Sequence, residues 1–371
     1  MHLLNQFLFA FACVASLMAT EPAKAADVST QFQQLASQYQ VCAAALVYIK
    51  AGQIQEPVFA NGCEETRMPD SDSIFQAASL GKPVFAYAVL GLVTQGKLAL
   101  DAPLMQYLPQ GYQHASQPGD SNSAHELVTD GRLQKVTARM VLQHTTGLPN
   151  WASGHLDFQF EPGARWQYSG EGFMLLQAVV EAITGMELEA WMQQQVFAPL
   201  GMLHSSYQPG KAWQDHLICG SLHGKALSLR VPRHAVAAAS LHASVTDYAR
   251  FVQAVLRDES AITRILANPV ITDQQSNVQW GLGWGLTHPN SAGQGVQSTL
   301  LWHWGNNYGY RAFVIADPAT GNGMVMLTNS DQGLKLAEAM TANIIPGQLS
   351  LFQFPMLGLK PGFACQVLGI C

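Results

Sequence analysis

Ser79 and Lys82 are the two residues whose types and spacing point most directly to chemistry. They stand three positions apart in the run Ser79-Leu80-Gly81-Lys82, so they share one face if the run is helical. A serine hydroxyl is a weak nucleophile by itself and needs an adjacent base, which the lysine amine can supply. The pair therefore predicts a nucleophile with its own base, as in a serine hydrolase.

Two later motifs, Tyr168-Ser169-Gly170 and His303-Trp304-Gly305, add a phenol, an imidazole and two glycines to this pair. A Ser-x-x-Lys spacing alone is weak evidence, because chance supplies it often. Taken singly, Ser79 and Lys82 fit an ordinary helix pair, and Tyr168 fits a core tyrosine. The ordered set of three motifs favours catalysis.

A buried helix is expected to carry the pair. Residues 74–95 are apolar around most of the helical circumference, which is typical of a helix at the centre of a domain. Pro83 is tolerated only near a helix start, so the helix should begin within a residue or two of Ser79. This places Ser79 at the positive end of the helix dipole.

The pattern of the whole chain predicts an α+β fold. Strands are expected at 42–49 and 57–63, as a hairpin, and again at 310–317 and 324–329. Helices are expected between and after these strands, at 137–143, 172–184, 188–197 and 333–344, while 111–131 looks like a solvated loop. The two chain ends should share one antiparallel sheet flanked by helices, with an all-helical lobe inserted and a cleft at the junction.

Composition limits the class of protein. With 371 residues, 48% hydrophobic and 12% charged, the chain should be globular. We expect one catalytic domain at 26–371, with an α/β lobe at about 26–95 and 240–345, a helical lobe at about 96–239 and a tail at 346–371. A net charge of -6 without a basic run argues against a nucleic-acid partner.

Residues 1–25 resemble a signal peptide, because 3–18 are largely apolar and Ala23-Lys24-Ala25 offers small residues for cleavage. We therefore expect export, to the periplasm or the medium. The start has no Lys or Arg, and Cys13 leaves lipid attachment as an alternative. No second membrane span is expected, since prolines and glycines interrupt the apolar residues 349–371.

Cleavage would leave five of the six cysteines. Cys42 and Cys63 fall nearly opposite each other across the predicted hairpin, so they form either a disulfide or two buried thiols. Cys365 and Cys371 could close a small loop. No cysteine spacing matches a zinc site, and His125-Glu126 lacks the later His of a His-Glu-x-x-His site, so we expect no metal and no cofactor.

From about Val41 to Asp331 the sequence resembles the serine hydrolases related to class C β-lactamases and D-alanyl-D-alanine carboxypeptidases, a family that includes esterases and D-amino-acid peptidases. Besides the three motifs, four segments match in type and order: Gly96-Lys97-Leu98-Ala99-Leu100-Asp101-Ala102-Pro103, His144-Thr145-Thr146-Gly147-Leu148-Pro149, Gly281-Leu282-Gly283-Trp284 and Leu327-Thr328-Asn329-Ser330-Asp331. The resemblance implies a β-lactamase/transpeptidase-like fold. No Gly-x-Ser-x-Gly elbow of an α/β-hydrolase is present.

The resemblance also implies roles for the residues. Ser79 would be the acylated nucleophile, Lys82 its proton acceptor or electrostatic activator, and Tyr168 the base and acid that relays the proton to the leaving group. Which of Lys82 and Tyr168 takes the first proton stays open.

The motif at 303–305 would wall the cleft, as the family's Lys-Thr-Gly does. Gly305 would let the substrate approach the strand, and the N–H groups of Asn306 and Ser79 would form an oxyanion hole. His144 is interpreted as a structural contact.

Two departures from the family bear on the substrate. Gly170 replaces the Asn whose amide binds the acyl side chain in β-lactamases and many carboxypeptidases. His303 replaces Lys and, being mostly neutral at pH 7, would bind a carboxylate less strongly. Arg311 is expected to compensate if it faces the cleft, and Glu171 is a further candidate polar contact.

We therefore expect a serine hydrolase that forms an acyl-enzyme with ester or amide substrates, either small molecules or short peptides. Esterase or D-amino-acid carboxypeptidase activity ranks above β-lactamase activity. The alternative from another class is a catalytically silent protein that binds ligands or assembles with itself. The sequence does not predict the oligomeric state.

Overall fold

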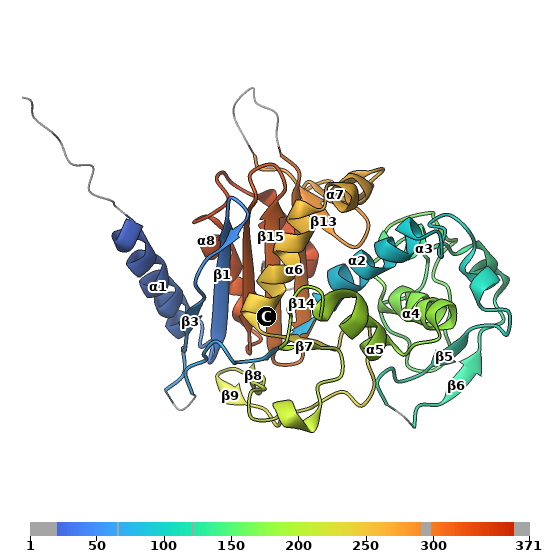
Figure 1. The fold of residues 1–371 in the computed structure, drawn as a ribbon, viewed down its shortest axis with the longest axis horizontal. Helices are drawn as coiled ribbons and strands as arrows, with labels where there is room; N and C mark the ends of the chain where they lie inside the picture. Colours follow the sequence, from blue (N-terminus) through green and yellow to red (C-terminus); the bar gives the residue numbers. More distant parts are fainter. Residues whose placement is uncertain (1–20, 65–66, 121, 291–297, 360–371) are drawn as a thin grey trace, which may run out of the picture.

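A nine-stranded antiparallel sheet is the centre of the computed structural model, which describes residues 21–64, 67–120, 122–290 and 298–359 (Figure 1). Its order is β11-β12-β13-β14-β15-β16-β1-β2, with β3 also paired to β1. The strands are β1 (Ala44–Lys50), β2 (Gln53–Ile54), β3 (Val58–Ala60), β11 (Val270–Asp273), β12 (Val278–Trp280), β13 (Gly285–Thr287), β14 (Leu300–Asn307), β15 (Tyr310–Asp317) and β16 (Asn322–Thr328). Pairing of β1 with β16 joins the two chain ends, so the predicted α+β fold is confirmed.

Alternating side chains give the sheet two apolar faces. On β1, Ala45, Val47 and Ile49 enter one core, while Ala44, Leu46 and Tyr48 enter the other. The first core packs against α6 (Val245–Arg257) and the helices around the nucleophile. The second is covered by α1 (Glu21–Gln38) and α8 (Ala337–Thr341).

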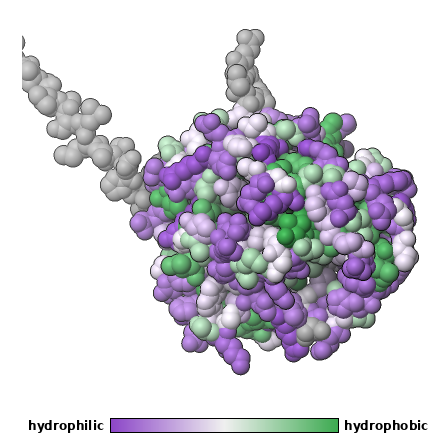
Figure 2. All heavy atoms as spheres, turned by 45° about the vertical axis from the view of Figure 1, so that its right-hand side comes forward, coloured by the Kyte–Doolittle hydropathy of each residue, from purple (hydrophilic) through white to green (hydrophobic). Residues whose placement is uncertain are grey.

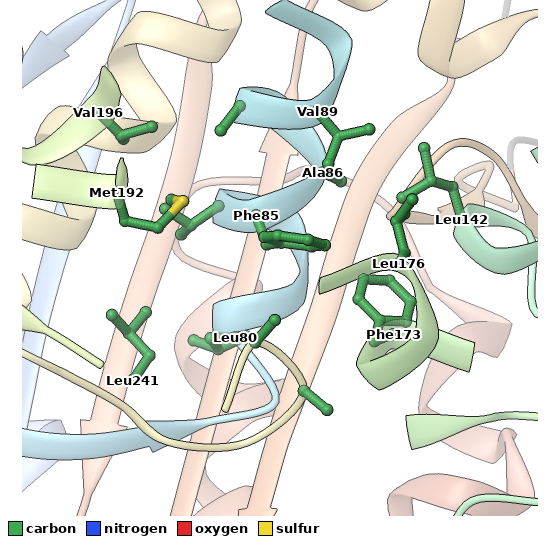
Figure 3. Close-up of a cluster of buried hydrophobic side chains, with 14 of the residues drawn as sticks. Leu80, Phe85, Ala86, Val89, Leu142, Phe173, Leu176, Met192, Val196 and Leu241 are labelled. Carbon is green, nitrogen blue, oxygen red and sulfur yellow. The ribbon is translucent and has the colours of Figure 1, made fainter. Parts of the chain in front are cut away.

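The remaining helices lie beside the sheet, to the right in Figure 1, except α7, which lies at its upper edge. They are α2 (Gly81–Thr94), α3 (Ala138–Leu142), α4 (Gly170–Thr184), α5 (Leu188–Met192), its π-helical continuation Gln193–Phe197, and α7 (Glu259–Leu266). In Figure 3, Met192, Val196 and Leu241 lie on one side of α2, and Leu142, Phe173 and Leu176 lie on the other. The expected buried helix is therefore confirmed, although residues 75–78 of the expected range form a strand.

Short elements complete the fold. Three small sheets contain β4 (Phe75–Ala78), β10 (Leu241–Ala243) and β7 (Ser205–Ser206); β5 (Gln113–Ala115) and β6 (His125–Leu127); and β8 (Ser221–Leu222) and β9 (Lys225–Ala226). The 3₁₀ helices are Leu104–Tyr107, Gly131–Lys135, Lys211–Trp213, Gly333–Leu336, Ser350–Gln353 and Pro355–Leu357. Figure 2 shows hydrophobic side chains reaching the surface in separate patches among hydrophilic ones.

Three expectations need correction. Residues 111–131 are not a simple solvated loop, because β5 and β6 form a hairpin there that buries His114 to 1% exposure. The strands at 270–287 were not expected, since each is only three or four residues long and shows little alternation. The expected last helix is a 3₁₀ turn followed by the short α8.

The hairpin at the start of the chain is closed by a Cys42–Cys63 disulfide, with 4.6 Å between the Cα atoms, so the first of the two alternatives is correct. Cys219 forms no disulfide within the described residues. Cys365 and Cys371, Cys13 and most of the expected signal peptide lie outside those residues. Among the helices described, none is long and apolar enough to cross a bilayer. The boundaries expected for the two lobes stay predictions.

Candidate active site

Ser79 lies at a sharp turn between β4 and α2. Ala78, immediately before it, has φ +54°, a left-handed conformation that is uncommon for a residue with a side chain and costs on the order of 1–3 kcal/mol. Two buried tyrosines fix the start of the helix: Tyr248 Oη donates to Leu80 O at 2.9 Å, and Tyr207 Oη donates to Gly81 O. The strained turn and these anchors hold the hydroxyl at the N-terminal end of α2.

Lys82 lies directly against the nucleophile. Its Nζ donates to Ser79 Oγ at 3.1 Å and to Ala238 O at 2.6 Å, and the side chain is fully buried. No carboxylate of the described residues pairs with it; the ring centroid of Tyr168 lies 4.7 Å from Nζ instead. Burial lowers the pKa of Lys82 to about 7. A substantial fraction of the amine is therefore neutral at neutral pH and able to accept a proton.

Tyr168 completes the group of three. Its ring packs 5.0 Å from that of Trp304 and 4.3 Å from that of His144, measured between centroids. Burial raises the pKa of Tyr168 above its usual range, and interaction with the Ser79 hydroxyl opposes the rise. The side chain is therefore a protonated phenol at rest. Its Oη makes no hydrogen bond of normal geometry to the residues described, so the proton is available to a leaving group.

His144 holds Tyr168 in place. The sequence indicated that His144 makes a structural contact, but not that the contact is with the segment around Tyr168. Its carbonyl accepts the N–H of Gln167 at 2.8 Å, and its Nδ1 accepts the N–H of Ser169 at 3.0 Å. His144 itself has φ +55°. Burial, followed by the charge of Lys82, lowers its pKa well below the usual value, so the ring is neutral. It acts on Tyr168 as a positioning residue.

The C-terminal end of β14, residues 303–307, lies on the other side of the site from His144. β13 pairs with β14 only as far as Trp302, which leaves the edge at 303–307 without a partner strand among the described residues. His303 is fully buried, its Nδ1 lies 2.8 Å from Trp304 O, and burial lowers its pKa to about 3. The imidazole is thus neutral at pH 7. Asn306, on the free edge, is exposed.

Gly305 is needed for a different reason than the one expected from the sequence. A Cβ at this position would lie 2.3 Å from Ala77 O and 3.1 Å from the Cβ of Ala312. The missing side chain therefore lets β14 pack against β4, two residues before the nucleophile. Approach of the substrate is not required to explain this glycine.

Gly170 and Glu171 begin α4 but contribute no polar group to the cleft. A Cβ on Gly170 would meet Asn150 O at 2.6 Å and the Trp151 ring at 3.0 Å. Glu171 is 0% exposed: Oε1 accepts the N–H of Ala152 at 2.9 Å, and Oε2 lies 3.3 Å from His114 Nε2. The expectation that Glu171 contacts the substrate is therefore wrong; its carboxylate is committed to internal partners.

Arg311 is also separate from the others. Alternation along β15 places Ala312 in the first core and Phe313 in the second, so Arg311 leaves the sheet on the second face, away from Gly305. Its guanidinium donates to Asn307 O at 2.9 Å and Tyr310 O at 2.8 Å. The structure therefore does not support compensation of His303 by Arg311.

Two contacts at the site could not be predicted from the sequence. The carbonyl of Ala238 binds Lys82, and Asn307 Nδ2 donates to Gln76 Oε1 at 2.7 Å and to Ala239 O at 3.1 Å. Both depend on a tertiary contact between distant segments. Among the residues described, no three His, Cys, Asp or Glu side chains are placed to hold a metal ion.

Comparison with known proteins identifies the family and the fold. Esterase EstB of Burkholderia gladioli is 28% identical over 330 residues, which cover 72% of this chain and 80% of the esterase. Penicillin-binding protein 4* of Bacillus subtilis is 23% identical over 74% of this chain and 65% of its own length. The D-alanine carboxypeptidase AmpC from Burkholderia cenocepacia shares the fold, with a TM-score of 0.69 and 18% identity over 86% of this chain and 99% of the carboxypeptidase. Residues 28–348 match the Beta-lactamase family model, and the chain belongs to that family of serine hydrolases and related proteins.

Proposed function

We propose that the protein hydrolyses esters or small amides through an acyl-enzyme on Ser79. The observation that carries the proposal is the contact of the buried Lys82 amine, which lacks a carboxylate partner among the described residues, with Ser79 Oγ at 3.1 Å. A base at this distance, with a pKa about 7, can take the hydroxyl proton as the serine attacks.

The other groups fit the remaining steps. The N–H groups of Ser79 and Asn306 would bind the oxyanion, and each such donor contributes on the order of 3 kcal/mol of transition-state stabilisation. Tyr168, a phenol at rest, would protonate the leaving alcohol or amine. Water would then attack the acyl-enzyme, with the same groups acting in reverse to release the acid and restore Ser79.

Ester substrates, or peptides containing a D-amino acid, rank above β-lactams. Asn150 and Trp151 occupy the space into which a side chain at Gly170 would extend, so the amide that relatives use for an acyl side chain has no counterpart at this position. The similarity to an esterase supports the same ranking. We also propose export, since residues 1–25 resemble a signal peptide and a disulfide such as Cys42–Cys63 is favoured in an oxidising compartment.

Covalent labelling distinguishes this proposal from the alternative, a catalytically silent protein of the same fold. Intact mass spectrometry after a fluorophosphonate should show one adduct on Ser79. Ser79→Ala should abolish both the adduct and ester hydrolysis with little change in melting temperature, because the hydroxyl is not part of a core. A folded wild-type protein that remains unlabelled and hydrolyses no ester would favour the silent alternative.

A further inference from the structure

We propose that Arg230 and Arg233 form a specificity subsite for an anionic group of the substrate. The inference rests on the proposed function, because it concerns a substrate that reacts at Ser79. It adds a substrate class: esters or amides with an apolar segment that ends in a carboxylate or a similar anion.

A cavity of about 940 Å³ adjoins the nucleophile and has room for such a segment. Ala239 lines it, next to Ala238, whose carbonyl oxygen lies 3.4 Å from Ser79 Oγ. Asn307 and Gln76, which are hydrogen-bonded to each other at 2.7 Å, line the same side. A substituent of a substrate held at Ser79 can therefore extend into this space.

The wall of the cavity includes two cationic side chains. Arg230 and Arg233 are exposed, and neither forms an ion pair with a carboxylate in the described part of the chain. Four other arginines are paired with aspartates: Arg67, Arg132, Arg139 and Arg250. One carboxylate, Asp120, lines the cavity, and its Oδ1 accepts the N–H of Asn122. Two guanidinium groups against one carboxylate leave the wall net positive in a chain of net charge -6.

The segment that bears the arginines is anchored. The Gln208 side chain donates to Arg233 O, and Gln177 donates to Ala235 O at 3.0 Å and accepts the N–H of Ala237 at 2.9 Å. Anchoring the backbone lowers the entropy lost when the guanidinium groups bind. Guanidinium groups also match a carboxylate in a bidentate manner, so two of them favour an anion over a neutral isostere.

Trp151 and Val231 give the cavity an apolar surface. They are 45% and 40% exposed and line the cavity together. The indole lies where a Cβ on Gly170 would approach it to 3.0 Å. Glycine at this position thus admits an aromatic wall beside the start of α4. An apolar segment would pack on this wall while its charged end meets the arginines.

Paired substrates test the proposal. One pair is the mono-4-nitrophenyl ester of adipic acid and its neutral methyl ester, which differ in the acyl part. The other is the butyrate ester of 4-hydroxyphenylacetic acid and that of the corresponding amide, which differ in the leaving group. We expect wild-type kcat/KM to favour the anion about tenfold in at least one pair. The preference should weaken in 1 M NaCl because salt screens exposed charges.

The double variant Arg230→Gln, Arg233→Gln should lose the preference through a higher KM at unchanged kcat, because the anion lies away from the reacting bond. Arg257→Gln, an exposed arginine of α6 beside Gly52, is the matched control and should keep it. Equal rates on acid and neutral esters, with Ser79 still labelled, would overturn this subsite and leave the proposed function intact. A preference that survives the double variant would also overturn it. Absence of labelling and of all hydrolysis would overturn both proposals.

Discussion

Lys82 and Glu171 are both fully buried charged residues near the N-terminal end of a helix, yet their surroundings differ. Lys82 has a hydroxyl, a carbonyl and aromatic rings around its amine, and no carboxylate partner among the described residues. Glu171 has a backbone N–H and the His114 imidazole on its two oxygens. His114 in turn lies 3.8 Å from Glu126.

The difference separates a reactive group from a structural one. Without an opposite charge, burial lowers the pKa of Lys82 to about 7, where the amine can gain and lose a proton during turnover. Burial raises the pKa of Glu171, and its contacts with Ala152 and His114 oppose the rise without reversing it. The same two contacts fix the position of the carboxyl group. Through these contacts Glu171 ties α4 to Ala152, in the loop that precedes it, and to His114 in the β5–β6 hairpin.

The largest effect is expected at Lys82. Lys82→Met should lower kcat by about 10²- to 10⁴-fold, the usual contribution of a positioned base. Lys82→Arg should not restore it, because a guanidinium keeps its proton. Steady-state ester hydrolysis by protein of verified fold measures both. Substantial activity in the arginine variant would show that Lys82 acts through charge alone.

A smaller effect, on stability, is expected at Glu171. Glu171→Ala removes this partner from the buried His114 and from the partly buried N–H of Ala152, and should cost about 3 kcal/mol of unfolding free energy. Glu171→Gln keeps an oxygen for Ala152 and should cost less. Urea unfolding gives both values, with kcat of the folded fraction changing by less than about tenfold. A large loss of kcat at unchanged stability would place Glu171 in the reaction and remove the contrast with Lys82.

The sequence predicted the surroundings of Lys82 better than those of Glu171. Ser79, Lys82 and Pro83 are local to one another, so spacing alone placed a nucleophile and an amine at a helix start. The strands from the two chain ends were also predicted, since β1, β15 and β16 are short apolar runs bounded by turn residues. Patterns of this kind need no knowledge of distant contacts.

Contacts between distant segments explain what the sequence missed. Glu171 was expected to face the substrate because it follows Gly170, but its direction is set by Ala152 and by His114 in a hairpin that looked like a loop. Arg311 was expected near the cleft, and the pleat of β15 sends it to the other face. Similarly, Gly305 is required by its close contact with Ala77, which is more than two hundred residues away in the sequence.

The smallest expected effect is a pH trend in stability that should distinguish Lys82 from an ordinary buried residue. The folded pKa of about 7 lies below the unfolded value of 10.5, so between these pH values the unfolded chain binds more protons and wild-type stability rises with pH. Lys82→Met lacks this titration. Its stability relative to wild type should therefore fall by about 2 kcal/mol between pH 6 and pH 9. The hydrogen bond to Ala238 O is lost at both pH values, so its loss shifts the stability curve without changing the trend.

Urea unfolding of the two proteins across this range measures the difference. Glu171→Gln, which leaves Lys82 in place, should retain the wild-type rise near pH 8. Parallel pH profiles for wild type and Lys82→Met would mean that the amine keeps an ordinary pKa and that burial alone does not prepare it as a base.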